Sequence, residues 1–80
     1  MLEELKNKNK LVGLKQSIKA LENDMVAKAF VALDADDKIK GPFIESCSSK
    51  NIEIEYVDTL MELGNACDIN IGAAIAVILK

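Results

Sequence analysis

Two almost entirely apolar segments do most to limit what this 80-residue chain can fold into. Residues 27–33 read AKAFVAL and residues 73–79 read AAIAVIL, and Lys28 is the one charged residue in either segment. Apolar runs of this length are typical of strands that are buried on both faces. A sheet built from such strands needs helices on both sides, because both of its faces must be shielded from water.

The first quarter of the chain predicts a helical arm, a short strand and a helix. Leu2 and Leu5 lie on the charged arm, and residues 11–12 form the strand. After Gly13, apolar residues recur at i, i+4 and i+7, which is the spacing of one face of a helix. This helix is expected to end near Asn23.

The middle of the chain predicts a loop, a helix and a strand. Residues 34–41, DADDKIKG, are expected to form the loop. Gly41 and Pro42 stand in the order of an N-cap and a first helical residue, and Asn51 would end the helix that they begin. Residues 51–57, NIEIEYV, alternate strictly, with two isoleucines and a tyrosine on one face and two glutamates on the other. Such a strand is half exposed and lies at or near a sheet edge.

The last part of the chain predicts one more helix, a loop and the second buried strand. Thr59 and Glu62 have the spacing of a capping box at the start of the helix. The loop DINIG, residues 68–72, precedes the strand at residues 73–79. We therefore predict an α/β fold, a three-layer αβα sandwich with a small mixed four-stranded sheet, in one domain that spans residues 1–80.

Residues that could carry catalysis or bind a metal ion are few. The chain has no histidine, and Cys47 and Cys67 have the spacing of neither a zinc site nor a disulfide framework, so both are expected to be buried small hydrophobes. Asp34, Asp36 and Asp37 could form a metal or acid–base cluster, but carboxylates are ordinary after a strand. No phosphate-binding loop, dinucleotide fingerprint or nucleophile elbow is present. We expect no cofactor, no metal ion and no enzymatic activity.

The sequence also predicts where the protein is found. Residues 1–10 lack the apolar core of a signal peptide, and the longest apolar run, residues 73–79, is too short to cross a bilayer. We expect a cytoplasmic protein without a membrane partner, and a monomer.

Charge is divided unevenly along the chain. The net charge of -3 by itself disfavours a nucleic-acid partner. Residues 1–19, however, hold five lysines and two glutamates, which gives +3, whereas residues 20–80 hold five lysines and eleven acidic residues, which gives -6. Because a polyanion responds to a local patch, the basic first part can bind nucleic acid although the whole chain is acidic.

Lys15, Gln16 and Lys19 lie at the start of the first helix that follows a predicted strand. The helix dipole disfavours a lysine there by about 0.3 to 1 kcal/mol. The lysines share an outward face, which could be an ordinary solvated face. Alternatively, free backbone N–H groups and two ammonium groups form an anion site suited to phosphate, and Gln16 adds a donor and an acceptor for a base edge. Gly13 would let a nucleic-acid backbone approach closely, or would simply form a tight turn.

Three segments resemble one known family, and their spacing along the chain is also that of the family. They are VGLKQSIKAL at residues 12–21, VALDAD at residues 31–36 and LGNACDINIGAAIAVIL at residues 63–79. The chain is similar to the kink-turn RNA-binding family of ribosomal protein L7Ae, especially its small bacterial members. The resemblance implies an αβα sandwich without catalysis. It also implies binding, in a ribosome or another ribonucleoprotein, to the sharply bent RNA motif in which tandem sheared G·A pairs flank a bulge.

The resemblance assigns roles to individual residues. Gly13 would meet the RNA backbone, and Lys15 and Gln16 would read the sheared G·A pairs in the major groove. Lys19 would contact a guanine edge and phosphates, while residues 69–71 would pack on the bulged nucleotides. The RNA-binding residues that it implies are Gly13, Leu14, Lys15, Gln16, Lys19, Asp34, Ile69, Asn70, Ile71, Gly72 and Ala73.

Two residues depart from the family's pattern. Asp68 stands where the family usually has glycine, so it places a negative charge close to the RNA and imposes a strained backbone. Asp37 stands where the family usually has proline, which bears on how the following helix starts. Ile69 and Ile71 have a second interpretation as core residues; if both are exposed, they form an apolar wedge suited to unpaired bases.

Other features of the sequence fit a protein-binding function. A module that keeps the fold but binds protein instead of RNA would agree with the acidic balance, with Asp68 and with the strand that carries Glu53 and Glu55. Our leading interpretation is a non-enzymatic protein that recognises and stabilises a kink-turn, with structured RNA, in a ribosome or another particle, as its partner.

Overall fold

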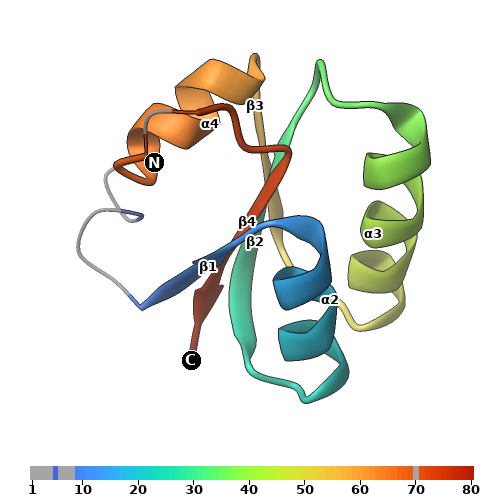
Figure 1. The fold of residues 1–80 in the computed structure, drawn as a ribbon. Coiled ribbons are helices and arrows are strands. Elements are labelled where there is room, and N and C mark those ends of the chain that lie inside the picture. The colour runs from blue at the N-terminus through green and yellow to red at the C-terminus, as the bar shows by residue number, and fades with distance from the viewer. Residues whose placement is uncertain (1–4, 6–8, 70) are drawn as a thin grey trace.

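The computed structural model describes residue 5, residues 9–69 and residues 71–80 (Figure 1). Leu2, on the predicted helical arm, and Asn70, in the predicted RNA-binding loop, lie outside the described residues. Leu5 is helical and fully buried against the core.

The described residues form four strands and three helices. Their order along the chain is β1 (Lys10–Val12), α2 (Leu14–Glu22), β2 (Val26–Ala32), α3 (Asp37–Ser49), β3 (Ile54–Val57), α4 (Leu60–Ala66) and β4 (Ile75–Leu79). The strands form one sheet in the order β1-β4-β2-β3, in which β4 is antiparallel to β1 and β2, while β2 and β3 are parallel. The predicted mixed four-stranded sheet is confirmed.

The sheet lies between two layers of helices, which confirms the predicted three-layer sandwich (Figure 1). α2 and α3 cover one face, and α4 covers the other. Alternate residues of the two central strands supply the two cores: Phe30 and Ala76 pack on the α4 side, whereas Val31 and Val77 pack against α2 and α3. Most residues of both strands are buried, as their apolar sequences predict.

The start of α3 corrects the expectation for this region. The helix begins at Asp37, inside the segment predicted as a loop, and Gly41 and Pro42 lie within it rather than at its start. The reason is that Asp36 is the N-cap, since its carboxylate accepts a hydrogen bond from Lys38 N at 2.9 Å. Asp37 then places a negative charge in the first turn, where the helix dipole favours it, so this helix starts well without the family's proline.

The central strands differ slightly from their predicted bounds. β2 begins at Val26 and ends at Ala32, one residue earlier at each end than predicted. β4 begins only at Ile75, because Ala73 N donates a hydrogen bond to Leu60 O of α4 at 3.0 Å instead of extending the strand.

β3 is an edge strand, as its alternating sequence predicts. Tyr56 is 48% exposed, although it belongs to the face assigned to the isoleucines. Glu55, on the opposite face, is partly buried, because Lys28 Nζ donates to its Oε1 at 3.0 Å and compensates its charge. The expected division into an isoleucine face and an exposed glutamate face is therefore only partly correct.

Cys47 and Cys67 are buried and free, which confirms their interpretation as small core side chains. Burial raises the pKa of the Cys47 thiol to about 11, because a thiolate there would lose its hydration. Burial also raises the pKa of Cys67, and the nearby charge of Lys10 acts in the opposite direction.

We expect the free energy of unfolding to fall as the pH rises from the ordinary thiol pKa of 9.0 toward about 11. In this range Cys47 ionises in the unfolded chain but stays protonated in the folded protein, so the unfolded state is stabilised. Below this range both states keep the proton, and the thiol has no effect. Urea denaturation across the range measures the loss, which should be smaller in Cys47→Ala; an equal loss in both proteins would contradict the assignment.

Candidate nucleic-acid interface

The segments predicted to bind RNA meet at one edge of the sheet. β1, β2 and β3 end at this edge and β4 begins there, because β4 runs antiparallel to its two neighbours. Gly13 follows β1, Asp34 follows β2, and residues 68–74 lead into β4. Gly13 N donates a hydrogen bond to Ile75 O at 2.9 Å. The start of α2 and the end of the loop before β4 therefore lie next to each other (Figure 1).

The N-terminus of α2 is open to a ligand. Its N-cap is Gly13, which has a φ of 112° that glycine adopts readily; no side chain caps the helix, and no acidic residue lies in its first turn. α3 and α4, in contrast, are capped by the side chains of Asp36 and Thr59. Lys15 and Gln16 in the first turn of α2 are exposed. Backbone N–H groups, an ammonium group and an amide are thus presented together, as an anion site requires.

Lys15 and Lys19 are exposed, and neither forms an ion pair with another residue in the described part of the chain. Lys28, Lys40 and Lys50 each pair with a carboxylate. The two charges on α2 are therefore available to a polyanion.

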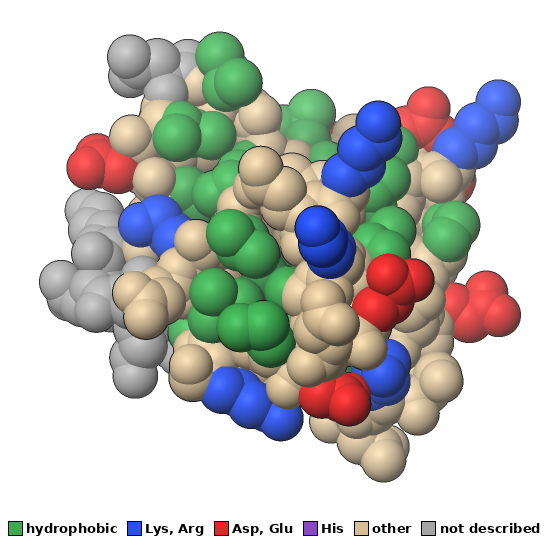
Figure 2. All heavy atoms as spheres, turned by 60° about the horizontal axis from the view of Figure 1, so that its bottom comes forward, with side chains coloured by type: hydrophobic (Ala, Val, Ile, Leu, Met, Phe, Trp, Pro, Cys, Tyr) green, Lys and Arg blue, Asp and Glu red, His purple; other side chains and the backbone are tan. Residues whose placement is uncertain are grey.

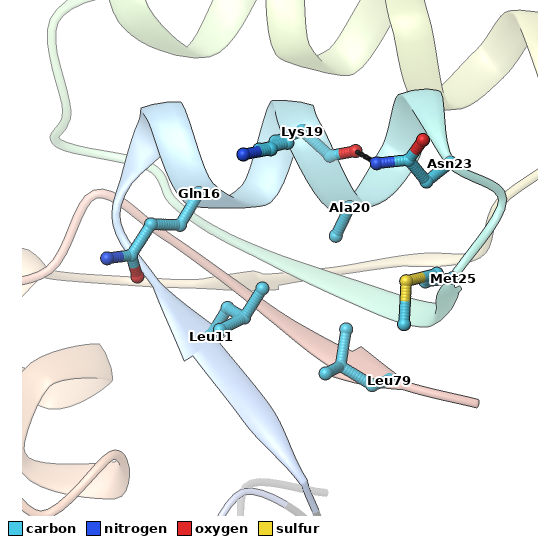
Figure 3. A pocket seen from close by; sticks show the side chains of 7 residues that line it. All are labelled: Leu11, Gln16, Lys19, Ala20, Asn23, Met25 and Leu79. Carbon is cyan, nitrogen blue, oxygen red and sulfur yellow. Dashed lines mark hydrogen bonds between the residues drawn. The ribbon is translucent and has the colours of Figure 1, made fainter.

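Lys19 lies in the last turn of α2 rather than at its opening. The negative end of the helix dipole favours a lysine there, so the expected conflict with the dipole is wrong for Lys19 and holds for Lys15. The Lys19 side chain nevertheless extends back along the helix toward Gln16 (Figure 3). Its ammonium group therefore adds to the surface formed by the first turn.

The loop before β4 presents an isoleucine to solvent. Ile71 is 71% exposed, whereas Ile69 is partly buried and packs against the core on the α4 side. The condition for a wedge made by both isoleucines is therefore not met, and Ile69 follows the alternative interpretation as a core residue. The loop backbone lies directly on α4, because a Cβ at Gly64 would lie 2.0 Å from Ile71 O. This glycine thus determines where the exposed isoleucine can lie.

Asp68 has a left-handed backbone with a φ of 66°, which confirms the strained conformation expected there. It directly follows the C-cap of α4, where Asp68 N donates to Asn65 O and Ile69 N donates to Gly64 O. This pair of hydrogen bonds is a Schellman motif, which usually has glycine in the left-handed position. The other two described helices end in the same way, at Asp24 and Asn51.

Four other residues predicted to bind RNA hold the site in place. Asp34 Oδ1 accepts a hydrogen bond from Leu60 N at 2.7 Å, which ties the end of β2 to the start of α4. Leu14 is partly buried and packs against the core under α2, and the Ala73 side chain is buried. Gly72 is exposed, and a Cβ there would meet Leu60 Cβ at 3.0 Å.

Two features of the structure have no counterpart among the expectations from sequence. One is the close contact at Gly64, which an isolated glycine in a helical pattern could have indicated. The other is a shallow groove beside α2 that includes Asn23 and Met25. The groove combines residues far apart in the chain, so no local sequence signal marks it.

Within the described residues, no cluster of three or more cysteine, aspartate or glutamate side chains could hold a metal ion. Asp34 and Asp36 accept hydrogen bonds from the backbone of Leu60 and Lys38. No described helix has the length and apolar character needed to cross a membrane.

Known proteins are similar to this chain in sequence and in fold. A model of the ribosomal protein L7Ae/L30e/S12e/Gadd45 family matches residues 1–80. An RNA-binding protein of Caldanaerobacter subterraneus subsp. tengcongensis is 43% identical over 67 residues, 84% of this chain and 82% of its own length. An RNA-binding protein of Halalkalibacterium halodurans is 39% identical over 70 residues, 88% of this chain and 85% of its own length. The solved 15.5kD RNA binding protein of Giardia lamblia has the same fold, with a TM-score of 0.89 at 21% identity over 99% of this chain and 70% of its own.

Proposed function

The chain belongs to the ribosomal protein L7Ae/L30e/S12e/Gadd45 family, and on this premise we propose that it binds structured RNA that contains a kink-turn. The observation that carries the proposal is the uncapped N-terminus of α2 beside the loop with Ile71, linked by the hydrogen bond from Gly13 N to Ile75 O. The names of the two relatives support an RNA ligand. The resemblance of residues 12–21 to kink-turn binders supports the kind of RNA.

Each part of this surface suits a different part of a kink-turn. The helix N-terminus and Lys15 suit phosphates, and the Gln16 amide can both donate to and accept from the base edges of sheared G·A pairs. Lys19 adds a second cation on the same face. Ile71 offers an apolar contact to the unpaired bases of the bulge.

The proposed mechanism is a shift of population. An RNA that samples bent and extended forms is held bent by a protein that binds the bent form more tightly, and a difference of about 5.5 kcal/mol moves the ratio from 1:99 to 99:1. No enzymatic step is needed. We further propose that the RNA belongs to a ribosome or another ribonucleoprotein in the cytoplasm.

Energy transfer between two dyes tests this mechanism. The dyes are placed at the two ends of a duplex interrupted by a kink-turn, at a salt concentration where the free RNA is mostly extended. Transfer efficiency should rise as the protein saturates the RNA, because the two arms approach each other. A saturated complex, seen by gel shift, with unchanged transfer would contradict the mechanism.

Two substitutions of Asp68 distinguish the effect of its charge from the effect of its backbone conformation. Asp68→Asn removes the charge but keeps a side chain that tolerates the left-handed region, so RNA binding should tighten by up to about 1 kcal/mol with little change in stability. Asp68→Gly also removes the strain and should raise the free energy of unfolding by up to about 1 kcal/mol. RNA titration and urea denaturation measure the two effects. Equal RNA affinity in all three proteins would place residue 68 outside the RNA contact.

Protein binding at β3 is the second candidate function. This edge strand ends beside Leu33, whose N–H donates to Val57 O, and both Leu33 and Tyr56 are about half exposed. An extended peptide can add to such an edge and cover apolar side chains. Equal weak binding to RNA with and without sheared G·A pairs would favour this function.

A further inference from the structure

A shallow groove of about 350 Å³ lies beside α2 (Figure 3). Its apolar lining comes from β1, from α2, from the turn before β2 and from the end of β4. These residues are Leu11, Ala20, Met25 and Leu79. In the space-filling view, apolar side chains gather on the face turned toward the viewer, with lysine and acidic side chains around them (Figure 2).

The polar groups of the groove all lie on or next to α2. They come from Gln16, Lys19 and Asn23. Asn23 Nδ2 donates to Lys19 O at 3.0 Å, which holds this amide in place (Figure 3). Apolar walls with a few oriented polar groups are typical of sites for small ligands, and this volume is at the lower end of their range.

The groove is continuous with the proposed RNA surface, because Gln16 and Lys19 belong to both. A phosphate held by Lys19 would bring the adjoining nucleotide to the mouth of the groove. We propose that the groove receives an unpaired nucleobase of the bound RNA, outside the kink-turn itself. This inference rests on the function proposed above and adds a second contact to it.

Met25 is suited to a flat base. Its side chain is 49% exposed, and a flexible thioether adapts to a flat surface and makes favourable contacts with aromatic rings. The amides of Gln16 and Asn23 offer donors and acceptors for the edge of the base. Unpaired bases are the usual targets of proteins that recognise RNA outside its duplexes.

Charge argues against a second copy of this chain as the occupant. A symmetric dimer would use the same patch twice and would bring the Lys19 side chains of the two copies toward each other. RNA instead brings a phosphate to Lys19. The positive charge of Lys19 at the groove therefore favours RNA.

Kink-turn hairpins with an unpaired extension test the inference. A blunt hairpin is compared with hairpins that carry a short unpaired extension on the 5′ strand or on the 3′ strand. We expect one of the extensions to tighten binding about tenfold, as the docking of a single base can. An abasic copy of that extension keeps the phosphates and should lose the gain.

Two methionine variants show where the base docks. Met25→Ser should remove the difference in affinity between the extended and the blunt hairpin. Met61→Ser is the matched control, because Met61 is 52% exposed but lies on α4, outside the groove. This control should keep the full difference.

Tight binding of the blunt hairpin without a gain from either extension would overturn the inference and leave the proposed function standing. The inference would also be overturned if the abasic extension gave the same gain in affinity, or if Met25→Ser kept the gain. Failure of the blunt hairpin to bind would overturn both proposals. A dimer in sedimentation equilibrium that Met25→Ser dissociates would assign the groove to a second copy and overturn the inference.

Discussion

The Gly64→Ala protein is expected to lose about 3 kcal/mol of stability and most of its RNA affinity. A Cβ at this position would lie 2.0 Å from Ile71 O and 3.3 Å from Gly72 Cα, and these backbone atoms cannot rotate away as a side chain would. Either the loop or α4 has to move. Because the loop carries the exposed Ile71, its displacement should weaken RNA binding beyond the loss of stability.

Gly41→Ala is the matched control for this substitution. Gly41 lies inside α3, and a Cβ there would meet nothing within 4 Å. Alanine is the better helix former, so this variant should gain about 0.5 to 1 kcal/mol. Urea denaturation of the three proteins measures both changes. Wild-type stability in Gly64→Ala would show that the loop is not seated on α4.

Lys19→Ala should weaken RNA binding by about 1 to 3 kcal/mol and lower the slope of log affinity against log salt by about one unit. The Lys19 ammonium group has no ion-pair partner in the described part of the chain, so the substitution should change stability little. Titrations at several salt concentrations measure affinity and slope together. An unchanged affinity and slope would remove Lys19 from the site.

Lys50→Ala is the matched control, because it also removes one lysine charge but does so outside the proposed site. Lys50 is the C-cap of α3 and pairs with Asp24 at 3.1 Å, and it belongs neither to the first turn of α2 nor to the lining of the groove. Loss of an exposed pair costs under about 1 kcal/mol of stability. We expect near wild-type RNA binding. An effect as large as that of Lys19→Ala would mean that only the total charge matters.

The fold follows from local sequence patterns because its central strands are nearly all apolar. Such strands have few alternatives to burial between helices, so the layers and the sheet could be predicted. The start of α3 could not, because Gly41 and Pro42 offer a reasonable helix start and Asp36 a competing one. The Asp36 cap prevails by satisfying a backbone donor of the first turn.

The candidate site could be predicted only in part. Exposure of Lys15 and Gln16 follows from helix periodicity, and the left-handed Asp68 follows from the glycine that the family places there. The different burial of Ile69 and Ile71 depends on how the loop packs against Gly64, which is a contact between segments. The groove at Met25 likewise depends on tertiary packing.

A comparison of two RNA hairpins shows whether the protein recognises a kink-turn. The first hairpin contains a kink-turn, and in the second the sheared G·A pairs are replaced by Watson–Crick pairs while length and charge stay the same. Phosphate contacts are alike in both, so any preference reports the bent motif itself. We predict tight binding to the first hairpin alone. Equal weak binding to both would contradict it.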